Sequence, residues 1–255
     1  MKFMSAVHSD IGIKKSKNQD SMCLKIASIP SGEVALMVVC DGMGGLKKGE
    51  LASATIIRIM SQWFENDLPN ILKNGFSSQI VKEEWEKIIK ENNEIINEYG
   101  ENYRIQLGTT ITSLLIVGDE YVIGQVGDSR AYKISENIEQ LTEDQTVVQR
   151  DINLGILTEE EGRKDPRQNV LLQCIGASRV VEPVFQEGKI ASGQEILLCS
   201  DGFRHLVEDE EIFAKLSPEL MVDEKEMKKG LIELVELNKS RKEKDNITAM
   251  LIKAI

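Results

Sequence analysis

Two stretches of the chain share a pattern in which a run of apolar residues ends at an aspartate followed by glycine. The first is Val38-Val-Cys-Asp41-Gly42, and the second is Leu197-Leu-Cys-Ser-Asp201-Gly202. A short apolar run that stops at turn residues is typical of a buried strand, and Asp-Gly favours a tight turn. Either aspartate alone could serve only its turn. The repetition indicates two buried strands that each end at an acidic turn.

Three further aspartates, Asp20, Asp128 and Asp245, also lie at the edges of apolar segments. Five aspartates at strand ends can converge on one rim of a fold, although their spacing leaves that convergence open. Oxygen-rich clusters suit hard divalent cations such as Mg²⁺ and Mn²⁺, and glycine after aspartate lets a backbone carbonyl approach as an extra ligand. The sequence therefore suggests a divalent-metal site if the five side chains meet.

The apolar segments predict strands at both ends of the chain with helices inserted between them. Turns at 118–119 and 127–128 predict that strands 109–117, 121–126 and 130–134 form one antiparallel meander. Apolar residues at helical spacing predict long helices over 51–66, 81–99 and 223–238. This order favours an α+β sandwich over a βαβ repeat. The other expected strands are 3–13, 22–29, 34–40, 195–199 and 246–252.

Composition narrows the class of protein further. A chain of 255 residues, 41% of them hydrophobic, can build one substantial core, so we expect a single domain over 1–255. No apolar run approaches the ~20 residues of a membrane-spanning helix, and none resembles a signal peptide, so we expect a cytoplasmic protein with no membrane partner. The formal net charge of −11 argues against nucleic acid as a partner. Four scattered cysteines and two histidines favour reduced thiols over a zinc site.

Several routes to phosphate chemistry lack their usual residues. The chain contains no Cys-x5-Arg, no Asp-x-Asp and no Gly-x-x-x-x-Gly-Lys-[Ser/Thr], and His8 and His205 are its only histidines. A cysteine nucleophile, an aspartyl-phosphate route and a histidine-rich metal pair are therefore disfavoured. Two ions about 3.5–4 Å apart can instead activate a shared water and need no protein nucleophile.

The ordered set of motifs resembles the type 2C (PPM) family of metal-dependent protein phosphatases, in its bacterial stand-alone form, over essentially the whole chain. Any one match is weak, but six in the family's order are specific. A segment of about 141–181 resembles the family's flap region. The six motifs are Asp10-Ile-Gly12 through Asn18-Gln-Asp20, Asp41-Gly-Met-Gly-Gly45 with Gly49-Glu50, Gly108-Thr-Thr110, Gly127-Asp-Ser-Arg130, Ser200-Asp-Gly202 and Asp245-Asn246.

The resemblance implies a four-layer αββα sandwich, in which helices flank two antiparallel β-sheets and a metal cleft lies at one end. It implies Mn²⁺ or Mg²⁺ as cofactor, with Asp41 bridging two ions, the carbonyl of Gly42 binding one, and Asp201 and Asp245 binding the other. The reaction would be in-line attack by metal-activated water on phosphoserine or phosphothreonine in proteins. A serine/threonine kinase and its targets would be the matching partners.

Two of the aspartates have less direct roles by the same resemblance, and the phosphate end of the site departs from the family pattern. Asp20 would act directly or through a bound water, and Asp128 with Asp201 would hold a third, weaker ion. Lys15 stands where the family usually has a phosphate-gripping arginine, and lysine lacks the two-pronged geometry. A solvated basic stretch is the alternative interpretation of Lys15. Histidines common in relatives are replaced by Met43, Leu46, Gln145 and Asp165.

These departures leave two alternatives to an enzyme. A catalytically silent pseudophosphatase would keep the sandwich as a binding module, although every proposed carboxylate is retained. An α+β binding protein whose aspartates only form turns would show no metal dependence. His205, four residues after Asp201, is expected to serve packing or hydrogen bonding before metal binding.

Overall fold

The computed structural model describes residues 1–43 and 48–255, so the position of Leu46 lies outside the described residues. Within these described residues, ten strands form two five-stranded antiparallel sheets that face each other. Sheet A has the order β1 (Phe3–Asp10), β10 (Ile247–Ala254), β9 (Glu195–Cys199), β6 (Arg130–Ile134) and β7 (Ile138–Gln140). Sheet B has the order β2 (Ser21–Ile29), β3 (Gly32–Cys40), β4 (Ile111–Val117), β5 (Glu120–Val126) and β8 (Val184–Lys189).

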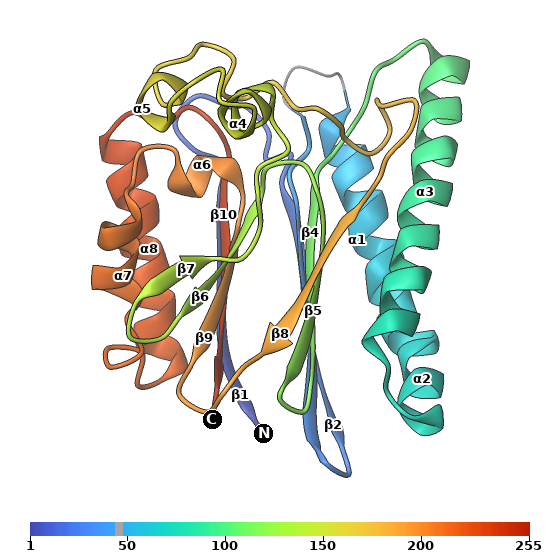
Figure 1. Cartoon of the computed structure of the whole chain (residues 1–255), viewed down its shortest axis with the longest axis vertical. Coiled ribbons are helices and arrows are strands. Elements are labelled where there is room, and N and C mark those ends of the chain that lie inside the picture. Colours follow the sequence, from blue (N-terminus) through green and yellow to red (C-terminus); the bar gives the residue numbers. More distant parts are fainter. Residues whose placement is uncertain (44–47) are drawn as a thin grey trace.

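Helices cover the outer face of each sheet (Figure 1). The outer face of sheet B packs on α1 (Gly49–Asn66), α2 (Leu68–Asn74) and α3 (Ser78–Tyr103). The outer face of sheet A packs on α6 (Asp201–Arg204), α7 (Asp209–Leu216) and α8 (Glu224–Ser240). A third apolar layer lies between the sheets. The predicted four-layer αββα sandwich and the three long helices are confirmed.

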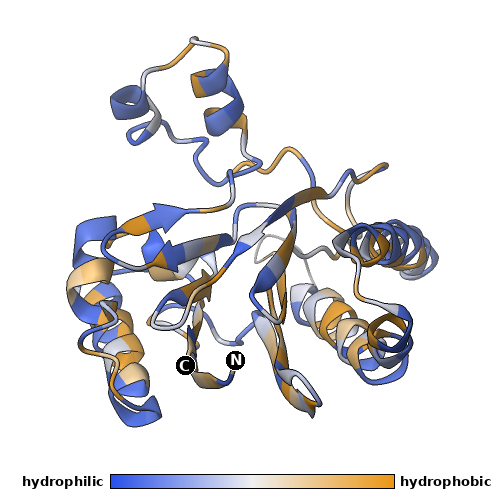
Figure 2. Ribbon diagram, turned by 60° about the horizontal axis from the view of Figure 1, so that its bottom comes forward, coloured by the Kyte–Doolittle hydropathy of each residue, from blue (hydrophilic) through white to orange (hydrophobic). Residues whose placement is uncertain are grey.

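Strand β3 shows why its sequence is almost continuously apolar. Val34, Leu36 and Val38 pack toward the helices of sheet B, whereas Ala35 and Met37 pack between the sheets. A strand covered on both faces has no solvent side, so it does not alternate between apolar and polar residues. Figure 2 shows the same apolar colouring concentrated inside the layers, with polar residues on the outer sides of the helices.

The predicted three-stranded meander is wrong. β4 and β5 pair in sheet B, but β6 pairs with β9 and β7 in sheet A. The chain therefore crosses between the sheets at Gly127, whose φ of 109° favours glycine. The free edge of β5 is filled by β8, which follows the flap segment. Local periodicity could not reveal this, because a turn within one sheet and a crossing to the facing sheet leave similar sequence patterns.

The flap segment, residues 141–181, stands out from the sandwich (Figure 2). It contains α4 (Val147–Asn153) and α5 (Glu159–Gly162), each begun by a threonine side chain that accepts a backbone N–H. Arg167 lies 3.1 Å from Asp151 and 2.7 Å from Asp165, so it ties the segment together internally. None of the helices in the described part of the chain is long and apolar enough to cross a membrane.

A buried glutamate lies at the other end of sheet A, far along β9 from Asp201. Glu195 is fully buried, neither of its carboxyl oxygens has a hydrogen-bond partner among the described residues, and Lys253 Nζ lies 3.6 Å from Oε1. Burial raises the pKa of Glu195 to about 8, although Lys253 opposes the shift. Glu195 therefore keeps its proton in the folded protein at neutral pH.

We expect this proton to make stability depend on pH. Between about pH 5 and pH 8 the unfolded chain releases the Glu195 proton while the folded protein retains it. The free energy of unfolding should therefore fall as pH rises, by up to about 1.4 kcal/mol per pH unit from this group. Urea unfolding of wild type and Glu195→Gln at several pH values measures the difference. Identical pH dependence in both proteins would contradict the prediction.

Candidate metal centre

Asp41 is placed by backbone contacts with the residues before β4. Its N–H donates to Thr110 Oγ1 at 2.9 Å, and its carbonyl oxygen accepts from Thr110 N and Thr109 Oγ1, both at 2.9 Å. Because these contacts satisfy the backbone of Asp41, the residue is held at the end of β3 without using its carboxylate. The carboxylate is left to interact with other groups at this end of the sandwich.

Glycines allow the acidic turns to approach one another. A Cβ on Gly202 would lie 2.2 Å from Asn246 O, so the Asp201 turn rests directly on the backbone next to Asp245. A Cβ on Gly42 would lie 2.5 Å from both Gln19 O and Gly49 O. Neither position leaves room for a side chain. The glycine of each Asp-Gly pair therefore touches the backbone of another segment, and the turn expected at Asp201-Gly202 is instead the start of α6.

Asn246 joins the segments that carry the acidic residues. Its Oδ1 accepts from Gln19 N at 2.9 Å, and its Nδ2 donates to Ile11 O at 2.9 Å and to Lys17 O at 3.1 Å. This amide holds the loop before β2 against the start of β10. The sequence pattern identifies Asn246 only as part of the motif Asp245-Asn246, because the residues that its side chain contacts lie far away in the sequence.

Asp20 and Asp201 each have one buried oxygen without a partner among residues 1–43 and 48–255. Ser200 Oγ donates to Asp20 Oδ2 at 2.9 Å, whereas Asp20 Oδ1 has no partner in the described part of the chain. The same holds for the buried Asp201 Oδ1. Buried polar atoms without partners are costly, so each such oxygen indicates a missing positively charged or donating group.

The five predicted aspartates lie within electrostatic range of one another. Burial raises the pKa of Asp41 well above its usual value, and Asp20, Asp201, Asp128 and Asp245 raise it further. Burial, followed by the charge of Asp201, also raises the pKa of Asp128 to about 7. The pKa of Asp20 rises to about 7, mainly through burial. The structure therefore brings together all five carboxylates at one end of the two sheets.

Such a cluster fits divalent cations. Like charges in a buried site are unfavourable unless a cation neutralises them, and carboxylate and carbonyl oxygens are ligands for Mg²⁺ and Mn²⁺. The unpaired oxygens of Asp20 and Asp201 are available for this purpose. Within residues 1–43 and 48–255, no three His, Cys, Asp or Glu side chains already form a closed metal-ligand group. Additional oxygen ligands, such as the Gly42 carbonyl and water, would have to complete a site.

Lys15 lies at the acidic cluster and is not part of a solvated stretch. Its Nζ is 2.6 Å from Asp245 Oδ1, and the side chain is only 27% exposed. Burial alone would lower the pKa of Lys15, but Asp245 outweighs it and the pKa is raised. Lys14 is exposed, and Lys17 is 66% exposed and pairs with Glu50 at 3.1 Å. The structure therefore separates Lys15 from its basic neighbours.

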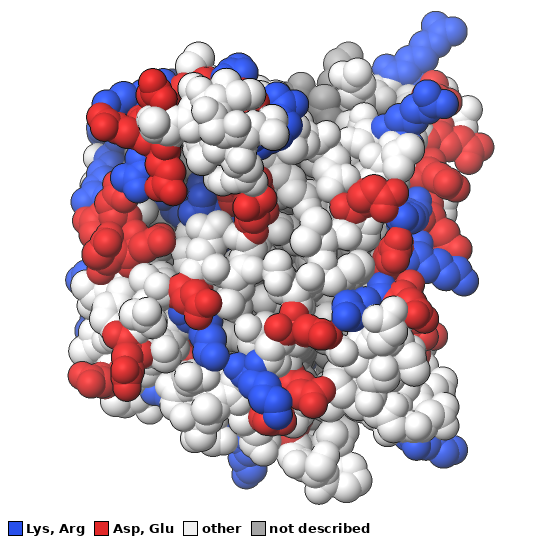
Figure 3. All heavy atoms as spheres, in the orientation of Figure 1, with Lys and Arg blue, Asp and Glu red and all other residues white. Residues whose placement is uncertain are grey.

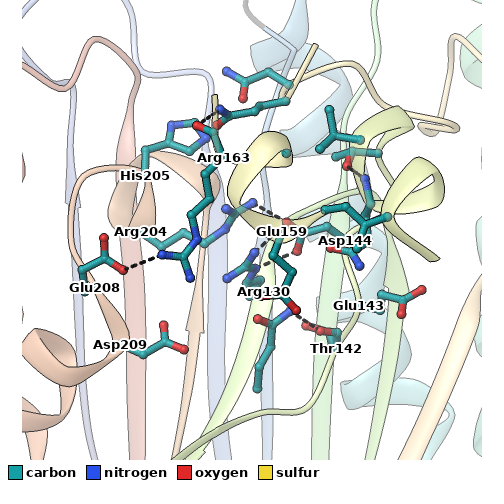
Figure 4. A pocket seen from close by; sticks show the side chains of 18 of the residues that line it. Arg130, Thr142, Glu143, Asp144, Glu159, Arg163, Arg204, His205, Glu208 and Asp209 are labelled. Atoms are coloured by element: carbon teal, nitrogen blue, oxygen red, sulfur yellow. Dashed lines mark hydrogen bonds and ion pairs between the residues drawn. The ribbon is translucent and has the colours of Figure 1, made fainter. Parts of the chain in front are cut away.

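A second charged network links Asp128 to the flap segment. Arg204 Nη2 donates to Asp128 O at 3.2 Å and to Asp144 Oδ2 at 2.9 Å, and it lies 4.0 Å from Asp128 Oδ2. Arg130 holds Asp144 with two hydrogen bonds of 2.7 and 2.8 Å. Figure 4 shows both arginines pointing toward Asp144. Sequence reasoning missed this network, because 60 residues separate Asp144 from Arg204 and no motif spacing joins them.

Arg130, Asp144 and Arg204 form one wall of a polar cavity of about 890 Å³ between the flap segment and the loop from α6 to α7. Glu159 and Arg163 line it from the flap side, and Glu208 and Asp209 line it opposite (Figure 4). Asn169 also lines this cavity. The cavity borders the acidic cluster through Arg204, which contacts Asp128. Over the face drawn in Figure 3, acidic and basic side chains are interspersed, so attraction of an anion has to be local.

Comparisons with known proteins agree with this arrangement. The sequence profile of the family described as Protein phosphatase 2C matches residues 13–236. A serine/threonine phosphatase stp from Listeria welshimeri is 30% identical over 220 residues, covering 85% of this chain and 83% of the relative. The structure of the S. agalactiae serine/threonine phosphatase has a TM-score of 0.84 and 29% identity, covering 99% of this chain and 100% of the other.

A third similar protein was solved with metal. The catalytic domain of the serine/threonine protein phosphatase PstP, in complex with two manganese ions, has a TM-score of 0.76 and 27% identity, covering 98% of this chain and 97% of the other. The family match, the named serine/threonine phosphatases and this manganese-bound neighbour together identify a metal-dependent protein phosphatase. The chain belongs to the protein phosphatase 2C family, and its activity is that of a serine/threonine protein phosphatase.

Proposed function

We propose that this phosphatase hydrolyses phosphoserine and phosphothreonine at a pair of Mn²⁺ or Mg²⁺ ions held by the acidic cluster. The observation that carries the proposal is the environment of Asp41, a half-buried residue whose carboxylate lies close to the charges of four others. Asp41 would bridge the two ions, the Gly42 carbonyl would bind one, and Asp201 and Asp245 would bind the other. Bound ions of this kind activate water and polarise phosphoryl oxygens.

The side chains around these ligands have their own tasks. Asp20, held by Ser200, would accept a hydrogen bond from a water or contact an ion directly. Asp128, with Asp201, would hold a third, weaker ion, and Arg204 lies beside it as a competing positive charge. Lys15 would bind the phosphate, because cation binding at Asp245 would release its ammonium group from the present ion pair. The phosphoprotein targets of a serine/threonine kinase are the corresponding substrates.

Hydrolysis of p-nitrophenyl phosphate and of a phosphothreonine peptide tests the proposal. We expect activity with Mn²⁺, loss of activity with EDTA, and recovery when Mn²⁺ is restored. The retained carboxylates favour this result over a silent binding module. Hydrolysis that persists after complete chelation would contradict the metal mechanism, and no hydrolysis with ample Mn²⁺ would favour the pseudophosphatase.

The role of Lys15 can be tested separately. We expect Lys15→Ala to raise KM for a phosphothreonine peptide by about tenfold or more, because a charge-assisted hydrogen bond contributes roughly 1.5–3 kcal/mol. Mn²⁺ affinity should not fall, since the substitution removes a cation that competes for Asp245. Steady-state kinetics and Mn²⁺ titration measure both effects. Exposed Lys14→Ala is the matched control, and an equal change in both variants would refute a specific role.

A further inference from the structure

Two ionisable side chains lie behind the proposed metal ligands and have no part in the function described so far. His205 follows directly after α6, four residues beyond Asp201, and its side chain is 16% exposed. Glu243 lies in the loop between α8 and β10, two residues before Asp245, and is 6% exposed. A buried glutamate needs partners to remain charged, so its contacts are informative.

Each nitrogen of the His205 ring faces a different carboxylate. Nε2 lies 3.3 Å from Asp201 Oδ2, and Nδ1 lies 3.5 Å from Glu243 Oε2. With both nitrogens facing acids, the ring is not positioned as a metal ligand. Asp201 is thus contacted through Oδ2, while its Oδ1 is buried and has no partner among the residues that the structure describes. The arrangement turns one oxygen of Asp201 toward the histidine and leaves the other for a cation.

Glu243 contacts the backbone of Asp245, the second of the two proposed ligands. Its Oε1 accepts from the N–H of Lys244 at 2.6 Å and from the N–H of Asp245 at 2.9 Å. The two carboxyl oxygens of Glu243 therefore have different partners. Oε1 accepts hydrogen bonds from the loop that carries Asp245, and Oε2 faces His205. A continuous line of contacts runs from Asp201 through His205 and Glu243 to Asp245.

We propose that His205 and Glu243 are positioning residues that hold Asp201 and Asp245 in register as two ligands of the same metal ion. This inference rests on the proposed function, which assigns both aspartates to one ion. A hydrogen-bonding partner behind a metal ligand fixes the orientation of that ligand, and loss of such an outer partner typically weakens metal binding about 10–100-fold.

The test is titration of metal-free protein with Mn²⁺ by calorimetry, together with the melting temperature of the metal-free protein. We expect His205→Asn and Glu243→Gln each to weaken one of two Mn²⁺ binding steps by about 10–100-fold. The double variant should be no weaker than the more affected single variant, because both substitutions break one line of contacts. The metal-free Glu243→Gln protein should melt cooperatively at a somewhat lower temperature than wild type, because, despite burial, His205 and backbone N–H groups lower the pKa of Glu243 and its charge therefore stabilises the fold, while glutamine keeps the shape and one carbonyl oxygen.

Controls separate this inference from general damage. His8→Asn replaces the other histidine, which contacts Lys228, and Glu187→Gln replaces an exposed acid paired with Lys82, so both should bind Mn²⁺ like wild type. If His205→Asn weakens Mn²⁺ binding while Glu243→Gln does not, or if the two effects add, the shared line of contacts is refuted. If wild type binds no Mn²⁺, the proposed function is refuted, and the inference that rests on it is refuted as well. If His205→Asn fails to fold, Glu243→Gln carries the test alone.

Discussion

Replacing Asp41 by asparagine is expected to lower Mn²⁺-dependent phosphatase activity by about a thousandfold or more. The substitution keeps the shape of the side chain but removes the charge that would bridge two cations. Metal ions contribute several kcal/mol to stabilising charge in a phosphoryl-transfer transition state, and each 1.36 kcal/mol corresponds to about tenfold in rate. The measurement is kcat for a phosphothreonine peptide at saturating Mn²⁺. Full activity in this variant would refute the assignment of Asp41.

The same substitution should stabilise the metal-free protein. The pKa of Asp41 is raised in the folded state, so its charge opposes folding at neutral pH. This cost is absent below about pH 3.8, where the carboxyl group is protonated in both states, and it grows as pH rises. Thermal melting in EDTA should therefore show a higher melting temperature for Asp41→Asn, with about 2–4 °C for each kcal/mol gained.

A matched control for Asp41 is Asp119, an exposed aspartate that pairs with Lys189 at 2.9 Å. Lys189 lowers the pKa of Asp119, which is the opposite of the shift at Asp41. Asp119→Asn should keep full activity and should not raise the melting temperature. Loss of activity together with higher stability is thus specific to the acidic cluster, and a fall in the melting temperature of Asp41→Asn would contradict the proposed repulsion.

Replacing Gly202 by alanine is the second substitution for which we expect a large effect. The new Cβ would lie 2.2 Å from Asn246 O, so the Asp201 turn and the loop of Asp245 would have to move apart. Displacement of catalytic groups by about 1 Å can cost roughly 100-fold in rate, so kcat should fall by about that factor. Overpacking should also destabilise the protein by about 1–3 kcal/mol.

The direction of the stability change in Gly202→Ala distinguishes overpacking from the effect of helix propensity. Gly202 lies in α6, and helix propensity alone predicts that alanine would stabilise the fold by about 1 kcal/mol. Gly118→Ala is the control, because that glycine has a φ of 65° but no atom within 4 Å of the added Cβ. It should cost some stability through strain and leave kcat unchanged. A more stable and fully active Gly202→Ala variant would show that the two turns do not depend on their close contact.

The fold could be predicted from the sequence where periodicity and turns suffice. Residues 34–40 of β3 are all apolar because both faces of the strand are covered there, and α1 and α3 show helical spacing. The error at β6 arose because the residues of a turn do not specify whether the next strand pairs within the same sheet. The pairing depends on β8 and β9, which lie more than 50 residues further along the chain. β8 pairs with the edge of β5, and β9 pairs with β6.

The residues of the candidate site, like the fold, could be predicted only in part. The five aspartates and Lys15 were named from strand ends and motif order, and the structure brings them together at one end of the sandwich. Their roles as ligands remain predictions. The groups that support them, Arg204, Asn246 and Glu243, were missed as supports because each acts on partners that no local pattern identifies.

The sequence by itself determined which residues can carry charge at this site and that each stands where a strand meets a turn, because residue type and strand periodicity are local properties. Only the tertiary structure decided that Gly202 rests on Asn246 and that Lys15 pairs with Asp245. It also decided that His205 lies between two carboxylates. The physical reason is that these contacts depend on how two sheets and their loops pack, and packing joins residues whose separation along the chain carries no signal of their meeting.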